Sequence, residues 1–335
     1  MRWGDAGSVL CVVWCVLGLV GAQSALAQGA LTPSGPPAPM MKTLTQVEPR
    51  TPISSLPHLI TEPGSYYLTT NVTGVVGQHG ITIQSGNVSL DLNGFSMLGV
   101  SGSLSGIHVR DETNIVVRNG IITRWGGYGI DAGDNAIGAH NCLYTDLVLS
   151  HNGSGGMRSG PCSVVKNCTS RRNKGNGIEA GLNSSVSDCA AMQNTMDGIE
   201  AGVGSTIIGC AARENMLAGI HCGTGAMIAK CAPHYNYDGI SVANDSHVLG
   251  NNVYGNWNGI VVTMDANRID GNNVVYHRGW GIKVQGTRNI IVRNAASRND
   301  SGDYTNATGN AVGQVIDVTG GTTITATNPW ANFSY

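Results

Sequence analysis

The sequence contains little charge and almost no phenylalanine. Only 12% of its 335 residues are charged, the formal net charge is −2, and there are 2 phenylalanines. No run of like charge occurs, so the chain does not offer the basic stripe that attracts a phosphate backbone. These deficits argue against a nucleic-acid-binding protein.

Glycine, in contrast, is abundant. The chain has 48 glycines, and 41% of its residues are hydrophobic although only 5% are aromatic. This composition describes many tight turns and small buried side chains rather than a bundle of helices. An all-β fold is therefore predicted.

The first residues have the pattern of an export signal. Arg2 precedes an apolar stretch over residues 9–20, and Ala25 and Ala27 flank Leu26 in the small-x-small pattern that signal peptidases cleave. The apolar stretch is shorter than the ~20 residues of a spanning helix. We expect a signal peptide over residues 1–27, no membrane span after its cleavage, and a periplasmic, cell-surface or extracellular protein. Residues 28–48, rich in Pro, Gly and Ala, predict a flexible linker.

A Gly-Ile or Gly-Met step then recurs along the chain. The central spacings are 21, 21, 21, 20, 20 and 22 residues, and such a fixed period indicates a repeat array. Short β-like runs separated by Gly and Asn fill each period, which predicts one coil of a parallel β-solenoid and about ten coils in all. The Ile or Met of each step is Ile81, Ile107, Ile130, Met157, Ile178, Ile199, Ile220, Ile240, Ile260 or Ile282.

Further columns of residues keep the same register. Coils that stack ~4.8 Å apart place identical residues directly above one another. Stacked Asn side chains can hydrogen-bond along the axis at a turn where the backbone is left-handed. The sequence predicts such a structural Asn ladder, made of Asn152, Asn173, Asn194, Asn215, Asn236, Asn256, His277 and Asn299.

The repeated Asn-x-x-x-Gly-Ile-x-x-Gly, followed by a short apolar strand and another Asn, resembles the repeats of the pectate-lyase-like superfamily, including NosD-type periplasmic proteins. The resemblance covers about residues 49–335. It implies a single right-handed parallel β-helix with coils of about 21 residues and with N- and C-terminal caps. The superfamily includes lyases, hydrolases, epimerases, tailspike-like binders and members without known chemistry, so the resemblance is specific for the fold and leaves the function open.

Seven of the nine cysteines follow the predicted signal peptide, and an odd number leaves at least one thiol unpaired. Cysteines one coil apart can form bridges, but buried thiols are favoured because Cys packs as a small hydrophobe. Cys142 and Cys162 are the best candidates for a disulfide. Neither Cys-x-x-Cys nor closely paired His occurs, which argues against a soft-metal site. The column of four is Cys168, Cys189, Cys210 and Cys231.

The residue after each inward Ile or Met should point outward, because side chains alternate along a strand. Glu179 and Glu200 would then lie about 5 Å apart on adjacent coils, next to His221. This spacing resembles the carboxyl pair of retaining glycosidases, so these three residues are candidate catalytic groups. Glu179, Glu200 and Asp197 are also candidate Ca²⁺ ligands. The alternative is a solvated ladder in which Arg158 and His221 neutralise the glutamates.

A second strip of outward residues precedes the Asn ladder. Arginine binds carboxylates through paired hydrogen bonds, and tyrosine offers a surface for stacking, so the strip suits acidic sugars. Whether the two strips share one cleft is left open by the sequence. The candidate substrate-binding residues are Arg171, Arg213, His234, Tyr235 and Tyr254.

The catalytic motifs of the superfamily are missing. Neither the Asn-x-Asp, Asp-Asp, Gly-His-Gly and Arg-x-Lys set of polygalacturonan hydrolases nor the Asp-Pro-His of alginate epimerases occurs. The favoured function is an exported β-helix protein that contacts extracellular or envelope polysaccharide. A polysaccharide lyase or glycoside hydrolase acting on an acidic glycan, and a purely structural surface rod, are the alternatives. Whether the protein is an enzyme and what its oligomeric state is are open, and Ca²⁺ is the one cofactor suggested.

Overall fold

The computed structural model describes residues 48–133, 138–305, 308–321, 324 and 327–335. The predicted signal peptide and the predicted linker, apart from Glu48, lie outside the described residues. The strands described below all lie in the unit Arg50–Tyr335.

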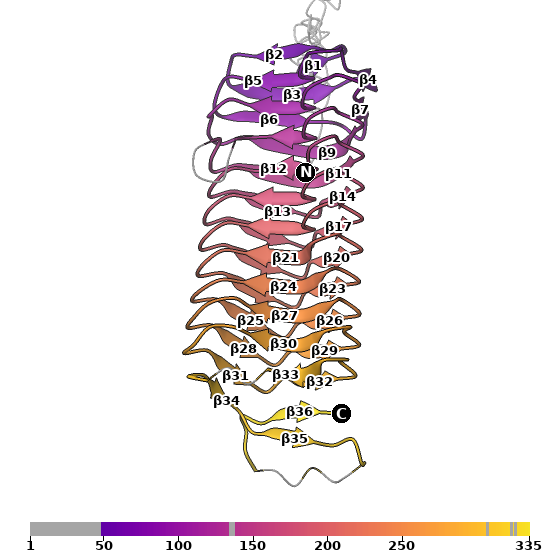
Figure 1. The fold of residues 1–335 in the computed structure, drawn as a ribbon. Coiled ribbons are helices and arrows are strands. Elements are labelled where there is room, and N and C mark those ends of the chain that lie inside the picture. Colours follow the sequence, from indigo (N-terminus) through magenta and orange to yellow (C-terminus); the bar gives the residue numbers. More distant parts are fainter. Residues whose placement is uncertain (1–47, 134–137, 306–307, 322–323, 325–326) are drawn as a thin grey trace, which may run out of the picture. The chain divides into compact units, whose positions relative to one another are not determined.

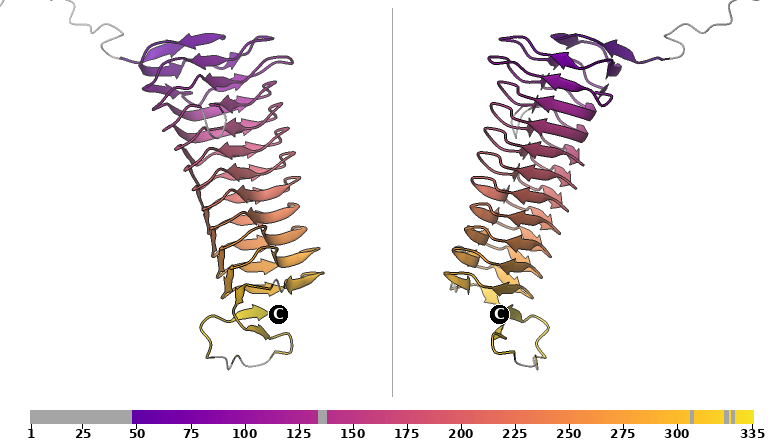
Figure 2. Two further views of the ribbon diagram at one scale, coloured as in Figure 1. Left: turned by 60° about the vertical axis from the view of Figure 1, so that its left-hand side comes forward. Right: turned by 90° about the vertical axis from the view of Figure 1, so that its right-hand side faces the viewer.

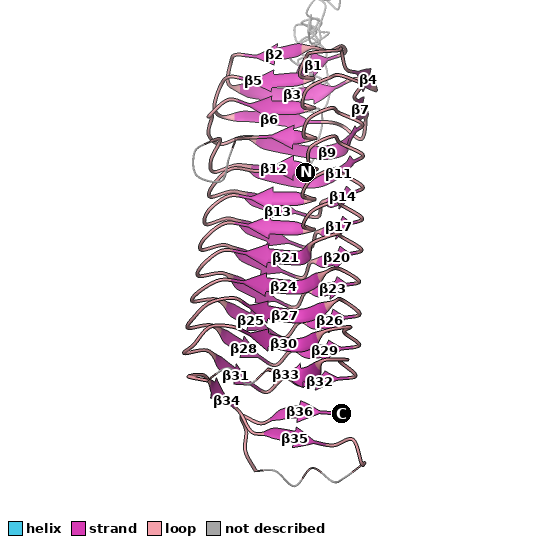
Figure 3. Cartoon of the chain, in the orientation of Figure 1, coloured by secondary structure: helices cyan, strands magenta, loops and turns pink. Residues whose placement is uncertain are grey.

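Parallel strands wind the unit Arg50–Tyr335 into a stack of coils (Figures 1 and 2). The described residues contain strands, turns and loops but no helix (Figure 3), which confirms the all-β prediction. One sheet has 12 strands: β2 (His58–Ile60), β5 (Ile81–Ile83), β8 (Ile107–Val109), β10 (Ile130–Asp131), β12 (Met157–Arg158), β15 (Ile178–Ala180), β18 (Ile199–Ala201), β21 (Ala218–Cys222), β24 (Asp238–Val242), β27 (Asn258–Val262), β30 (Trp280–Val284) and β33 (Gly302–Tyr304).

The other sheet has 24 strands, because a typical coil contributes two strands to it. These strands are β1 (Thr51–Ile53), β3 (Gly64–Leu68), β4 (Val72–Thr73), β6 (Val88–Asp91), β7 (Ser96–Leu98), β9 (Val116–Thr123), β11 (Leu143–Ser150), β13 (Val164–Lys166), β14 (Thr169–Arg171), β16 (Ser185–Ser187), β17 (Ala190–Met192), β19 (Thr206–Ile208), β20 (Ala211–Arg213), β22 (Met227–Ala229), β23 (Ala232–His234), β25 (His247–Leu249), β26 (Asn252–Tyr254), β28 (Arg268–Asp270), β29 (Asn273–Val275), β31 (Ile290–Val292), β32 (Ala295–Ser297), β34 (Ala311–Val312), β35 (Val315–Asp317) and β36 (Asn332–Ser334).

Each strand of the 12-stranded sheet belongs to one coil, so the sheet marks two more coils than the ten Gly-Ile or Gly-Met steps predict. In the first coil His58 of β2 pairs with Ile81, and in the last coil Tyr304 of β33 pairs with Ile282. Neither His58 nor Tyr304 follows a glycine, so the sequence step does not mark these terminal coils. The estimate of about ten coils was therefore too low.

The core is a set of apolar columns, as predicted. Ile178, Ile199 and Ile220 pair in register in β15, β18 and β21, and Ile240 and Ile260 continue the column. All five side chains are 0% exposed. Burying one such side chain contributes about 1.5–3 kcal/mol, so the column is a major source of stability.

The Asn ladder lies inside the turn that leads into the 12-stranded sheet. Asn194 Nδ2 donates to Asn215 Oδ1 (3.0 Å), and Asn215 Nδ2 donates to Asn236 Oδ1 (3.0 Å). The glycine of each step is needed for this packing, because a Cβ at Gly198 would lie 2.6 Å from Asn215 Nδ2. The prediction of left-handed backbone at the turn holds for the residue before each ladder position, such as Glu214 (φ 55°), and not for the Asn itself.

The seven cysteines of the described residues are free thiols. The predicted pairing of Cys142 with Cys162 is wrong, since Cys142 is buried in the core while Cys162 is exposed. The column of four packs inward, and each of its thiols contacts backbone carbonyl oxygens, as Cys210 Sγ does at Ile208 O (3.4 Å).

The C-terminal strand β36 takes the place of a further coil. It pairs with β32, and Asn332 accepts hydrogen bonds from Asn294 N (3.0 Å) and Nδ2 (3.2 Å). This contact continues a second column of stacked asparagines, in which Asn251 Nδ2 donates to Asn272 Oδ1 (2.9 Å) and Asn272 Nδ2 to Asn294 Oδ1 (2.9 Å). Among the described residues no helix is long and apolar enough to cross a membrane.

Ile199→Asp should destabilise the solenoid by several kcal/mol, because a carboxylate would enter a fully buried apolar column. Denaturant unfolding followed by circular dichroism measures the change. Val203→Asp, at a 49% exposed position of the same coil, is the matched control and should change stability by less than about 0.5 kcal/mol. Equal stability of the two variants would contradict the assigned register.

Candidate functional site

The outward face of the 12-stranded sheet carries the acidic column predicted from the sequence. Glu179 in β15 pairs in register with Glu200 in β18, and Glu200 pairs with His221 in β21. Both glutamates are half-buried and His221 is exposed. The three candidate catalytic residues therefore lie on adjacent coils.

The partners of these groups differ from the simple neutralised ladder. Tyr128 Oη donates to Glu179 Oε2 (3.3 Å), and the Asn176 amide donates to Glu200 Oε2. Arg158 instead donates two hydrogen bonds to Asp131 Oδ1, from Nε (3.1 Å) and Nη2 (2.8 Å). Each glutamate is thus held by a neutral donor, and the guanidinium beside them is engaged with a different carboxylate.

Asp197 lies next to this column, and both of its carboxylate oxygens have a partner. Its Oδ1 accepts from Ala218 N (2.7 Å), and its Oδ2 lies 3.4 Å from His221 Nδ1. His221 therefore faces Asp197 rather than Glu200. Within the described ranges no group of three or more His, Cys, Asp or Glu side chains is arranged to hold a metal ion, so Glu179, Glu200 and Asp197 do not converge as a ready-made Ca²⁺ site.

Two titrating groups of the column have shifted pKa values. Burial, and then the charge of Glu200, raise the pKa of Glu179. The hydrogen bond to Asp197 raises the pKa of His221 against the opposing effect of burial. A raised pKa makes a carboxyl group better suited to act as a general acid.

The structure extends this face by residues that the sequence reasoning missed. The rings of His79 and His108 stack with centroids 4.4 Å apart. His108 Nδ1 lies 3.7 Å from Asp131 Oδ2, too long for a hydrogen bond but within ion-pair distance. Contacts with His108 and Arg158 hold the pKa of Asp131 well below its usual range although burial opposes this.

Irregular coil lengths explain why this extension was missed. Ile81, Ile107, Ile130 and Met157 are separated by 26, 23 and 27 residues. His108 nevertheless occupies the same outward column as Asp131, because β8 and β10 pair in register. Tracing the outward column through the irregular coils would have found it.

The second predicted strip lies on the strands that lead into the Asn-ladder turn. Arg213, His234 and Tyr254 pair in register through β20, β23 and β26. Tyr235 follows at the left-handed turn position (φ 56°). Arg171 lies two coils from Arg213, with Met192 between them, so the structure brings together four of the five predicted residues.

These four residues contact one another. The His234 ring meets the Tyr254 ring edge-on with centroids 5.8 Å apart, and Tyr235 meets Tyr254 at 5.5 Å. The Arg213 guanidinium lies over the Tyr235 ring (5.6 Å) and pairs with Glu214 Oε1 (2.8 Å). The result is an aromatic surface against which the Arg213 guanidinium packs.

Three further aromatic residues join this surface. The rings of Tyr237 and Trp257 stack at 6.1 Å with an interplanar angle of 4°, and Tyr276 lies 5.4 Å from Tyr254. Their exposed fractions are 53% for Tyr237, 47% for Trp257 and 46% for Tyr276. We call the five residues Tyr235, Tyr237, Tyr254, Trp257 and Tyr276 the aromatic strip.

A cavity of about 350 Å³ opens on the aromatic strip. Tyr235, Tyr237 and Trp257 line it together with Met216 and Arg278. Neither glutamate of the acidic column lines it, so this cavity and the acidic column are separate sites on either side of the ladder turn. Sequence reasoning missed Tyr237 and Trp257, although each directly follows a ladder asparagine and tracing that column would have found the pair.

Comparison with known proteins supports the fold. Residues 69–231 match the family model described as the right handed beta helix region. The A-module of the Azotobacter vinelandii mannuronan C-5 epimerase AlgE4 is similar in structure, with a TM-score of 0.63 and 14% identity over 78% of this chain and 90% of that module. No curated protein matches the sequence.

Two longer solved proteins are also similar. The Dettilon tailspike protein has a TM-score of 0.53 and 15% identity over 85% of this chain and 61% of its own. The catalytic domain of a GH87 alpha-1,3-glucanase has a TM-score of 0.56 and 9% identity over 78% and 63%. The chain thus spans less than two thirds of either. These similarities show the fold alone, and the prediction of a right-handed parallel β-helix is confirmed.

Replacing Glu179 and Glu200 together with Gln should raise the melting temperature at neutral pH. The pKa of Glu179 is raised in the folded protein, so stability present at acidic pH is lost as the pH rises through that value. The variant lacks this loss, and its advantage should therefore disappear at acidic pH, where the carboxyls of the parent are protonated. Thermal melting across a pH series is the measurement.

The exposed Glu62→Gln variant is the control for a simple change of net charge. Repeating the series with Ca²⁺ adds a second comparison, because a cation bound by the two glutamates would stabilise the parent by mass action and not the double variant. Equal melting temperatures of the parent and the double variant at every pH would show that the two carboxylates do not destabilise the folded protein.

Proposed function

We propose that the protein is exported and binds an extracellular or envelope polysaccharide along the aromatic strip. The observation that carries the proposal is the set of exposed rings of Tyr235, Tyr237 and Trp257 around one cavity, with Tyr237 stacked on Trp257. The export pattern of residues 1–27 supports the location, and residues 49–335 would form the single β-helix domain of the mature protein.

The physical argument starts from exposure. Large apolar rings that stay exposed in a cluster mark a surface for binding, since scattered single residues need no such explanation. The flat face of a sugar ring presents C–H groups, which pack on aromatic faces, while its hydroxyls reach polar atoms at the ring edges. A sugar chain lying along the coils would meet a new ring about every 5 Å, close to the length of one sugar unit.

Charge favours an acidic glycan at this strip. Arg213 and Arg278 lie at its rings, and Glu214 offsets only the first of them. Arginine pairs with carboxylates through two parallel hydrogen bonds. Two proteins of similar structure, a mannuronan C-5 epimerase module and an alpha-1,3-glucanase catalytic domain, are consistent with a polysaccharide partner.

A second candidate function is a polysaccharide lyase or glycoside hydrolase at the acidic column. The favouring observation is Glu179, half-buried, with a raised pKa, and one coil from Glu200. Glu179 would serve as the general acid, Glu200 as base or nucleophile, and His221 as an auxiliary base. Because this face also carries Asp131 and Asp197, an acidic substrate would need a cation such as Ca²⁺ to offset repulsion.

Trp257→Ala should weaken polysaccharide binding by roughly two- to tenfold, as expected from the loss of about 0.5–1.5 kcal/mol of aromatic contact. Affinity electrophoresis and calorimetry with a panel of acidic and neutral polysaccharides provide the measurement. Trp330→Ala removes a comparably exposed tryptophan outside the strip and should leave the affinity unchanged. A parent protein that binds no member of the panel would favour the structural rod.

Turnover is tested separately on the same panel with and without Ca²⁺. New reducing ends report hydrolysis or elimination, and the absorbance of unsaturated sugars reports elimination alone. If the acidic column is catalytic, Glu179→Gln should lower kcat by about 10²–10⁴-fold, whereas Glu62→Gln should not. Binding without turnover by the parent would leave a non-catalytic glycan-binding protein.

A further inference from the structure

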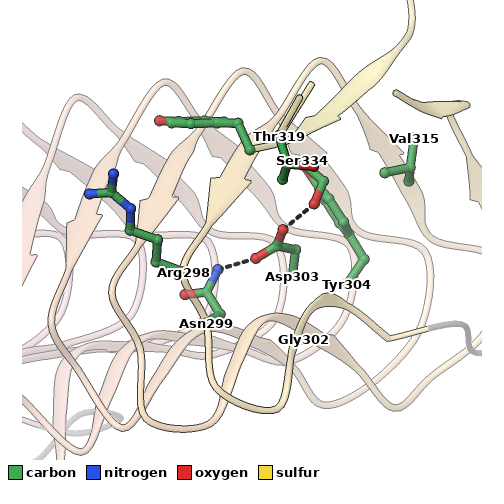
Figure 4. Close-up of a pocket in the computed structure, with 9 residues that line it drawn as sticks. Arg298, Asn299, Gly302, Asp303, Tyr304, Val315, Thr319 and Ser334 are labelled. Atoms are coloured by element: carbon green, nitrogen blue, oxygen red, sulfur yellow. Dashed lines mark hydrogen bonds between the residues drawn. The ribbon is translucent and has the colours of Figure 1, made fainter. Parts of the chain in front are cut away.

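A second and larger pocket lies at the C-terminal end of the solenoid. Its volume is about 770 Å³, which is within the usual range for small-molecule sites. Residues of the last coil line one side, and the C-terminal segment lines the other, as Figure 4 shows for Arg298, Asp303, Val315 and Ser334.

The pocket lies where the aromatic strip ends. The column that contains Tyr254 continues through Val275 and Ser297. β36 pairs with β32, and Tyr335 N donates to Ala296 O (3.2 Å), which places Tyr335 next in this column. Tyr335 lines the pocket, so a chain that follows the strip arrives there.

Arg298 links the strip to the pocket directly. Its guanidinium lies over the Tyr276 ring (4.9 Å to the centroid) and donates to the Tyr276 hydroxyl, while Arg298 itself lines the pocket. Arg298 occupies the same left-handed turn position (φ 55°) as Tyr276 on the preceding coil and Tyr235 further along the column. The guanidinium of this last turn therefore lies between the aromatic strip and the pocket.

The polar groups of the pocket form a complementary pair. Asp303 is oriented by two donors, Asn299 Nδ2 at 2.7 Å from Oδ1 and the Ser334 hydroxyl at Oδ2 (Figure 4). Its remaining lone pairs can accept hydrogen bonds from sugar hydroxyls. Arg298 can pair with a carboxylate. A uronic acid unit, which carries both hydroxyls and a carboxylate, fits this combination better than a neutral sugar does.

We propose that this pocket binds the terminal uronate unit of an acidic polysaccharide whose chain lies along the aromatic strip. The inference rests on the proposed function. Val315 and Thr319 of the C-terminal segment line the pocket on the side away from the coils. In this arrangement the glycan chain ends in the pocket, and the protein recognises the terminal unit.

The test uses uronate oligosaccharides of defined length, each as the free acid and with only its terminal carboxyl group methyl-esterified. The parent protein should bind the free acid about tenfold more tightly than the ester, because the ester loses a charge-assisted bidentate contact. Arg298→Ala should bind both forms with the same, weaker affinity. Asp303→Asn should weaken both forms equally, because it alters the hydroxyl contact and keeps the discrimination.

Trp257→Ala separates this inference from the function on which it rests. This variant should bind all ligands more weakly and still prefer the free acid. If Arg298→Ala discriminates between acid and ester as the parent does, Arg298 does not bind the terminal carboxylate. The inference is then wrong, while the proposed polysaccharide binding at the aromatic strip is unaffected. If the parent binds neither polymer nor oligosaccharide, the proposed function fails and the inference with it. Unchanged melting of the variants shows that their folds are intact.

Discussion

Each coil of the solenoid hydrogen-bonds to the coils above and below it in register, so a residue at one position meets its counterpart about 4.8 Å away. Isoleucine satisfies this constraint by packing on isoleucine, and asparagine satisfies it by donating and accepting along one line, as Asn194 and Asn215 do. Like charges do not satisfy the constraint, because stacked in register they repel each other. Glu179 and Glu200 are therefore the positions where stacking opposes stability, and neutral donors from Tyr128 and Asn176 hold them.

Columns that obey stacking could be predicted from the sequence, and contacts that depart from it could not. The isoleucine column and the Asn ladder follow from a period of about 21 residues because every member has the same neighbours. Long side chains can instead contact a residue at a different position of the neighbouring coil, as His221 contacts Asp197 and not its register partner Glu200. The stacking of Tyr237 on Trp257 does follow the columns, since each residue directly succeeds a ladder asparagine, and it was missed because the other coils carry different residues at this position.

The two candidate surfaces reflect this difference between sheet and turn. On the sheet face, side chains are fixed in direction by pairing, which gives a regular row of ionisable groups. At the ladder turn, the buried asparagine anchors the backbone while the residues beside it vary freely. Successive turns can thus present Tyr235, Tyr276 and Arg298 without disturbing the core, and a surface selective for a ligand can be built there at little cost in stability.

The coil-to-coil hydrogen bonds also determine how the solenoid would respond to mechanical load. These bonds run along the stacking axis, so tension between the ends of the unit loads the coils in series, and rupture begins at the weakest junction rather than everywhere at once. β10 and β12 have only two residues each, the shortest strands of their sheet. The two hydrogen bonds from Arg158 to Asp131 Oδ1 span this same junction. They reinforce the shortest pairing of the 12-stranded sheet against separation of its two coils.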